Sequence, residues 1–177
     1  MFNALNNLYS LTLEKSDKAP RIVLKISALL DYMLYDCSNK YIDLSKEIES
    51  IRNYIEIQEI RFGKEADINV DIQENIEDNQ IAPLLFLPFI ENAFKHGLSK
   101  NFGKGFISIN LRIANNFITL KVENSISENF NLNNNLSKGI GLENVKKRLE
   151  LQYKDKYQLD IKEAAKLFVI DLLIEIK

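Results

Sequence analysis

The spacing of apolar residues changes along this chain from a helical period to an alternating one, which restricts the fold to a mixed helix–sheet class. Up to Phe62, apolar positions recur every three to four residues, as in amphipathic helices. Beyond Gly63, five segments alternate apolar and polar residues, which predicts half-buried strands over Ile68–Ile72, Ile107–Ile113, Ile118–Val122, Tyr157–Ile161 and Ile170–Ile176. Asn115-Asn116 is a hairpin turn signal. Segregated helices and strands predict an α+β sandwich with helices on one face of the sheet.

Three helices are predicted before the first long strand. They cover Phe2–Leu13, about Pro20–Asp36, and Leu44–Phe62 with Ser45 as N-cap and Glu47 in the first turn. The second helix has a broad apolar stripe made of Ile22, Ile26, Leu29 and Met33, widened by Leu24, Leu30 and Leu34. Such a stripe either packs against a second chain in a four-helix bundle or docks on the chain's own globular part.

Composition excludes several classes of protein. The 177 residues are 46% hydrophobic, enough for a core, and the net charge of −2 gives no reason to expect nucleic acid or an anionic membrane surface as a partner. A single cysteine excludes a disulfide framework and suits a reducing compartment. The chain shows no signal peptide and no long apolar run, so we expect a cytoplasmic domain.

The segment LPFIENAFKHG, which ends at Gly97, is an apolar helical run with polar residues in its last turns. A helix that is apolar on most sides is normally buried, so its polar side chains need partners. The spacing places Asn92, Lys95 and His96 on one face, with Glu91 beside them. This set suits a magnesium-bound polyphosphate, because Mg²⁺ takes oxygen ligands and lysine meets phosphate as a point charge. The alternative is a set of ordinary hydrogen-bonded or solvated side chains.

A second segment, KGIGLENVKKRL, carries Gly139 and Gly141 at the start of an amphipathic helix. Glycine lets a backbone approach a ligand closely, and a helix start favours an anion. Asn144, in the first turn, would reach phosphate or solvent. The polar loop from Ile126 to Lys138 has the composition of a lid that orders on nucleotide.

These segments resemble motifs of the sensor histidine kinases. IENAFKHG is similar to the N box and GIGLENVKKRL to the G2 box of their ATP-binding domain, which has the histidine-kinase/Hsp90/gyrase-type sandwich fold. FNALNN at Phe2–Asn7 and RNYIEIQEIRFG at Arg52–Gly63 are similar to segments of the subfamily that often pairs with LytTR-type response regulators. The resemblance covers nearly the whole chain.

The resemblance implies a role for each matched residue. Glu91 would be the general base that activates a histidine in trans, and Asn92 the Mg²⁺ ligand. Asn124 stands where the family's G1 box has an aspartate that accepts from the adenine amino group, and Ile126 stands where that box has glycine. The remaining nucleotide contacts would come from Lys95, His96, Gly139, Gly141, Leu142 and Asn144. The implied cofactors are ATP and Mg²⁺.

The family's phosphoacceptor histidine would lie just before Met1. We therefore expect a cytoplasmic piece of a longer, membrane-anchored sensor, with a truncated dimerisation hairpin over residues 1–40 and an ATP-binding domain over residues 41–177. Because the only histidine present is His96, we expect that the piece binds nucleotide but does not autophosphorylate. The implied partners are ATP or ADP, a response regulator and a second copy of the chain. The alternatives are an ATPase of the same superfamily and a dimerising module with a vestigial nucleotide pocket.

Overall fold

A computed structural model describes residues 2–63, 66–73, 79–98, 105–126, 140–164 and 166–176. Its helices are α1 (Phe2–Leu13), α2 (Ala19–Tyr35), the short 3₁₀ helix η1 (Asp36–Ser38), α3 (Leu44–Phe62), α4 (Leu87–Gly97) and α5 (Ile140–Gln152). Its strands are β1 (Ile42–Asp43), β2 (Asp67–Ile72), β3 (Gln80–Ile81), β4 (Phe106–Ala114), β5 (Phe117–Ser125), β6 (Tyr157–Ala164) and β7 (Leu167–Glu175). No helix among these residues is long and apolar enough to cross a bilayer.

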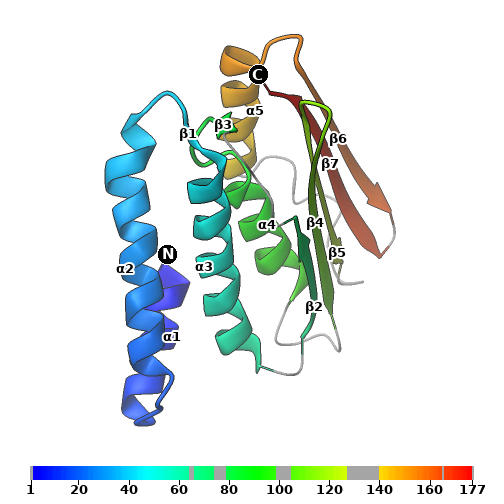
Figure 1. Cartoon of the computed structure of the whole chain (residues 1–177). Coiled ribbons are helices and arrows are strands. Elements are labelled where there is room, and N and C mark those ends of the chain that lie inside the picture. The colour runs from blue at the N-terminus through cyan, green and yellow to red at the C-terminus, as the bar shows by residue number, and fades with distance from the viewer. Residues whose placement is uncertain are drawn as a thin grey trace.

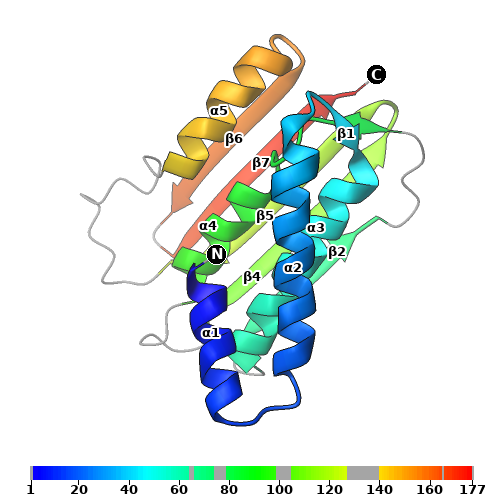
Figure 2. The ribbon, with the colours of Figure 1, turned by 90° about the vertical axis from the view of Figure 1, so that its left-hand side faces the viewer.

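The structure confirms the predicted α+β sandwich. Strands β2-β4-β5-β7-β6 form one sheet, in which β2 runs parallel to β4 and the other neighbours are antiparallel. Helices α3, α4 and α5 cover one face of this sheet, and the α1–α2 hairpin lies outside α3 (Figure 1). The alternating residues of the strands face these helices and form the main core. The fold therefore places α4 and α5, which carry the two predicted nucleotide motifs, next to each other on the sheet (Figure 2).

The predicted hairpin turn between β4 and β5 is confirmed. Asn115 and Asn116 both have positive φ, +50° and +64°. Two consecutive residues of this kind are the geometry of a type I′ turn, which matches the twist of the flanking strands. The turn fixes the register that pairs Ile113 with Ile118, so the alternating apolar residues of both strands reach the same face.

The apolar stripe of α2 divides between two environments. Ile22, Ile26 and Leu29 are buried within the chain, where they form a small core with Ala4 of α1 and Ile57 of α3. The other side of the stripe remains on the surface, with Leu24 71% and Leu34 67% exposed. The inner residues therefore dock on the chain's own globular part, and only the outer ones are available to a second chain.

The sequence predicted Ser45 as the N-cap of α3, and this prediction is wrong. The N-cap is Asp43, and Ser45 is an exposed residue inside the helix. Helix α3 begins where it does because of a two-stranded sheet, β1 paired with β3, that the sequence did not reveal. Leu44 N then donates to Asn79 O at 2.8 Å, which satisfies an amide at the helix start without a capping side chain.

Candidate nucleotide site

Helix α4 is held in place by its apolar sides. Phe89, Ile90, Ala93 and Phe94 are buried in the main core, and a proline stands in the first turn, where the missing N–H has no intrahelical partner to lose. The polar residues of the last two turns occupy the helix positions that do not face the core. The sheet and α3 therefore decide which polar side chains of α4 can meet a ligand.

Two amide side chains, one on α4 and one on β5, each have a buried polar atom without a partner among the described residues. Nδ2 of Asn92, on α4, is buried and has no hydrogen-bond partner among the described residues. Asn124, on β5, is 1% exposed. Its Nδ2 donates to Ser125 O at 2.8 Å, but its Oδ1 has no partner in the described part of the chain. Buried polar groups are normally paired, so a donor and an acceptor left open here point to a ligand with complementary groups.

Gly97 explains how the end of α4 comes close to Asn124 of β5. A Cβ added at Gly97 would lie 2.7 Å from Asn124 Cβ, which is too short for any real contact. Ser125 Oγ donates to Gly97 O at 3.0 Å and fixes the same approach from the other side. The sequence marks Gly97 only as the end of a motif and gives no sign of Ser125, because a contact between a helix end and a distant strand leaves no periodic signal.

We expect Gly97→Ala to lower the free energy of unfolding by about 1–3 kcal/mol, the usual cost of forcing extra volume into a packed site. Gly141→Ala is the matched control, because a Cβ there would meet only Pro88 Cβ, at an ordinary 3.8 Å. It should stay within about 0.5 kcal/mol of the wild type. Urea denaturation of both variants measures the difference. Equal stabilities would show that the Gly97–Asn124 approach imposes no constraint.

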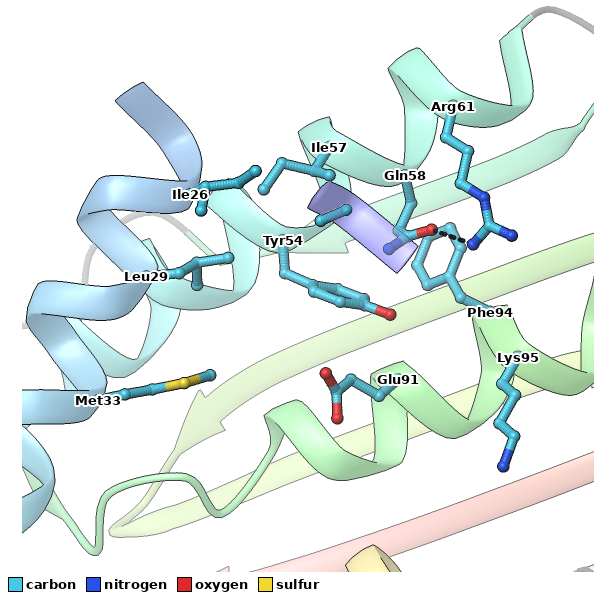
Figure 3. A pocket seen from close by; sticks show the side chains of 11 residues that line it. Ile26, Leu29, Met33, Tyr54, Ile57, Gln58, Arg61, Glu91, Phe94 and Lys95 are labelled. Carbon is cyan, nitrogen blue, oxygen red and sulfur yellow. Dashed lines mark hydrogen bonds between the residues drawn. The ribbon is translucent and has the colours of Figure 1, made fainter. Parts of the chain in front are cut away.

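Glu91 and Lys95 lie on another side of α4, in the lining of a cavity of about 200 Å³ that lies between the α1–α2 hairpin, α3 and α4. The carboxylate of Glu91 and the hydroxyl of Tyr54 point into the same space, with Arg61 above them (Figure 3). The Tyr54 ring is fixed edge-on against Phe94, with the centroids 5.7 Å apart. Lys95 thus lines the same cavity as Glu91, whereas Asn92 does not. The phosphate-facing role of Lys95 stays a prediction.

His96 is half-buried beside Lys95. Burial, together with the nearby Lys95 charge, lowers the pKa of its imidazole. Near neutral pH the ring is therefore uncharged and can both donate and accept a hydrogen bond. Such a group is suited to contacting a nucleotide without adding charge.

Helix α5 contributes the other predicted residues. Gly141 and Asn144 are exposed in its first turn, at the positive end of the helix dipole, so both are accessible to an anion. Leu142 is 2% exposed and its side chain belongs to the main core. Gly139 and most of the predicted lid, residues 127–138, lie outside the described residues. The nucleotide roles of all four residues stay predictions.

Helix α3 contributes two side chains to the cavity beside Glu91 that the sequence patterns alone did not indicate. Tyr54 and Arg61 reach the cavity beside Glu91, and burial and Glu91 raise the pKa of Tyr54 well above its usual value. Both belong to the RNYIEIQEIRFG segment, whose resemblance to the family implied no role for either residue. Their shared spacing of seven residues, two helical turns, was the signal that could have placed them on one face.

The donor set can be tested against the implied magnesium ion. Among the described residues, no group of three or more His, Cys, Asp or Glu side chains could hold a metal by itself. Asn92 offers one amide oxygen, and Mg²⁺ in nucleotide sites typically takes one or two protein oxygens, with the rest supplied by phosphates and water. The residues therefore fit an ion that arrives with a polyphosphate.

Comparisons with known proteins show the family of the chain. Residues 1–66 match the family model described as histidine kinase. The sensor histidine kinase YpdA of Escherichia coli K12 is 31% identical over 160 residues, which cover 86% of this chain and 28% of YpdA. The sensor protein LytS of Oceanobacillus iheyensis is 26% identical over 98% of this chain and 32% of its own length. The chain thus spans about a third or less of these two relatives.

Solved structures show the same fold. The histidine kinase AdeS of Acinetobacter baumannii superposes with a TM-score of 0.55 at 13% identity, over 96% of this chain and 84% of that one. The catalytic domain of the histidine kinase ThkA also gives 0.55, at 14% identity, over 76% of this chain and 93% of that domain. The fold is that of the histidine kinase ATP-binding sandwich. Together with the family match and the relatives, it identifies the chain as part of the sensor histidine kinase family.

Proposed function

We propose that this chain binds Mg-ATP between α4 and α5 and forms the catalytic core of a sensor histidine kinase, which transfers the γ-phosphoryl group to a histidine. The observation that carries the proposal is the pair of open amides. Asn124 Oδ1 is a buried acceptor for an adenine amino group, and Asn92 is an amide next to the helix turn that carries Lys95 and His96. An asparagine oxygen can accept the bond that the family's aspartate accepts, without its charge.

The polyphosphate would extend from Asn92 toward the start of α5. Gly141 leaves open space at that helix start, and the helix dipole favours negative charge there. Asn92 would hold Mg²⁺ through its amide oxygen, and the ion would neutralise charge on the phosphate oxygens. Lys95 would add a positive charge near the γ-phosphate, and His96 and Asn144 would add neutral hydrogen bonds. Phosphoryl transfer depends mostly on this positioning and charge neutralisation.

Glu91 would act as the general base. Its carboxylate lies in the cavity between the hairpin and α4, so an imidazole on a hairpin helix could reach it. There it would accept a proton as the ring nitrogen attacks the γ-phosphorus and ADP leaves. The phosphohistidine would then serve a response regulator of the LytTR type, with this domain on the cytoplasmic side of a membrane-anchored parent.

The proposal predicts that the chain alone is not labelled by γ-labelled ATP, because its only histidine is His96 on α4. The same chain, extended upstream by the family's histidine-bearing segment, should incorporate label. Glu91→Gln in that longer protein should slow labelling about 100-fold or more, the range for loss of a general base, with ATP affinity largely retained. Glu49→Gln, an exposed change on α3, is the control. Full-rate transfer by Glu91→Gln would contradict the base assignment.

We also propose that the outer side of the α1–α2 hairpin joins two chains into a dimer, because Leu24, Leu34 and Tyr35 leave apolar surface exposed there. Leu24→Asp with Leu34→Asp should raise the dimer dissociation constant at least about tenfold, since charges would be buried in an apolar contact. Leu151→Asp on α5 is the control, because Leu151 is 83% exposed. Sedimentation equilibrium decides, and an unchanged mass in the double variant would exclude this surface. A change of Ile26 to aspartate would not test this surface, because Ile26 is buried within the chain.

A dimerising module with no catalytic role is the second candidate, because the chain has Asn124 in place of the family's aspartate. It predicts that the extended protein dimerises but incorporates no label. The labelling experiment therefore separates it from the kinase. An ATPase of the same superfamily would instead release phosphate without labelling a histidine.

A further inference from the structure

Residues Ala82–Phe86 lead into α4 and form a connector whose peptide groups are bound by side chains from two sides. On the α5 side, the backbone N–H of Ala82 donates to the hydroxyl of Tyr153 at 2.8 Å, and Arg148 donates to the carbonyl of Pro83. Arg148 lies on α5, and Tyr153 directly follows the last residue of this helix, whose first turn contains Gly141 of the proposed phosphate site. The connector is therefore attached to one of the two helices of the nucleotide site.

On the other side, the connector is bound by a fully buried carboxylate from α3. Glu47 Oε1 accepts from the N–H groups of Leu85 and Phe86, and Oε2 from that of Leu84, each at 2.9 Å. These amides precede the first turn of α4, where a carboxylate also interacts favourably with the helix dipole. Burial raises the pKa of Glu47, whereas its hydrogen bonds favour the ionised form.

Tyr32 extends this network to the helical hairpin. It lies on α2, is 5% exposed, donates its hydroxyl proton to Glu47 Oε2 and accepts from Leu84 N at 3.0 Å. Burial raises the pKa of Tyr32, so the group stays a hydroxyl and a donor. Leu84 has a φ of +54°, which is costly for a leucine and persists only where the surroundings fix it. One hydroxyl from α2 thus helps to hold a strained residue at the entrance to α4.

We propose that Tyr32 and Glu47 are positioning residues for the nucleotide site, and that they link the docking of α2 to the binding of nucleotide. The inference rests on the proposed function. A short packed helix moves as one body, so a shift of the connector displaces Asn92 on α4 relative to Asn124 on β5. Because linkage is reciprocal, a nucleotide that holds α4 in place must also favour the docked position of α2 by the same factor.

The test is Tyr32→Phe, which removes one hydroxyl and keeps the ring. Tyr9→Phe is the control, because Tyr9 lies on the same helical hairpin but is 65% exposed. Affinity for Mg-ADP is measured by calorimetry, at a temperature where denaturation curves show each variant fully folded. Backbone amide exchange is measured with and without Mg-ADP. We expect Tyr32→Phe to weaken Mg-ADP binding about fivefold, a coupling at the low end of the usual range, and Tyr9→Phe to leave it unchanged.

Exchange without nucleotide should accelerate in the connector and α4 of Tyr32→Phe, and stay unchanged in β4 and β5. Mg-ADP should slow exchange in α2 of the wild type, and less so in Tyr32→Phe. Unchanged affinity, or acceleration spread evenly over all elements, would show that Tyr32 is only part of the packing and would overturn the inference. If the wild type binds no Mg-ADP, the proposed function fails, and the exchange pattern without nucleotide still decides whether Tyr32 positions α4.

Discussion

Glu47→Ala is expected to lower the free energy of unfolding by about 3 kcal/mol, because each buried N–H left unpaired costs about 1–3 kcal/mol. Glu47 is fully buried, and among the described residues it is the only acceptor for the amides of Leu85 and Phe86. Leu84 N would keep the Tyr32 hydroxyl as acceptor at 3.0 Å. Two amides are therefore left without a partner, and a cavity is added where the carboxylate was. Urea denaturation followed by circular dichroism measures the loss.

Two controls separate this mechanism from a general sensitivity of α3. Glu49→Ala, an exposed change on the same helix, should stay within about 0.5 kcal/mol of the wild type. Glu47→Gln should lie between the two, because a glutamine has one accepting oxygen and its NH₂ group would meet a donor. A Glu47→Ala protein as stable as Glu49→Ala would show that the connector finds other partners.

Asn92→Ala is expected to weaken Mg-dependent nucleotide binding by at least about tenfold. Loss of groups that merely support a metal ligand costs about 10–100-fold, so loss of the proposed ligand itself should cost no less. The unpaired Nδ2 of Asn92 is removed at the same time, so stability should not fall much. Calorimetry with Mg-ADP and with ADP plus a chelator separates the magnesium-dependent part of the binding.

Asn110→Ala provides a matched control for this change. Asn110 lies on β4, and its Nδ2 makes only a long 3.4 Å contact to Asp71 at the surface. Its removal should leave nucleotide binding unchanged. If Asn92→Ala bound Mg-ADP as the wild type does, Asn92 would be a structural amide and the magnesium assignment would be wrong.

The fold could be predicted because its signals are local. The alternation of Ile107, Ile109 and Leu111 and the Asn115-Asn116 turn act over a few residues, and the structure reproduces them. The strand pair β1–β3 was missed because two residues per strand show no period. The first turn of α3 was therefore also read wrongly, since the start of that helix is fixed by a bond from Leu44 to Asn79.

The site could be predicted only in part, because motifs name residues and not their neighbours. Glu91, Asn92, Lys95 and His96 do share one helix, but the structure places Glu91 and Lys95 at a cavity with Tyr54 of α3, apart from Asn92. Glu47 read as an ordinary acidic residue in a helix's first turn. Its burial depends on amides 37 to 39 positions further along the chain, which no local pattern can reveal.

The central claim, that this chain is a nucleotide-binding kinase core, is tested most directly by titrating the unmodified chain with ATP in the presence of Mg²⁺. The open Oδ1 of Asn124 predicts saturable binding of one nucleotide per chain. The proposed binding of Mg²⁺ by the amide oxygen of Asn92 predicts that chelating magnesium weakens it. They also predict competition by ADP, and weaker competition by GTP, because guanine carries a carbonyl oxygen where adenine carries the amino group that Asn124 Oδ1 would accept from. Absence of saturable heat at millimolar ATP, or competition by GTP as strong as that by ADP, would contradict the account.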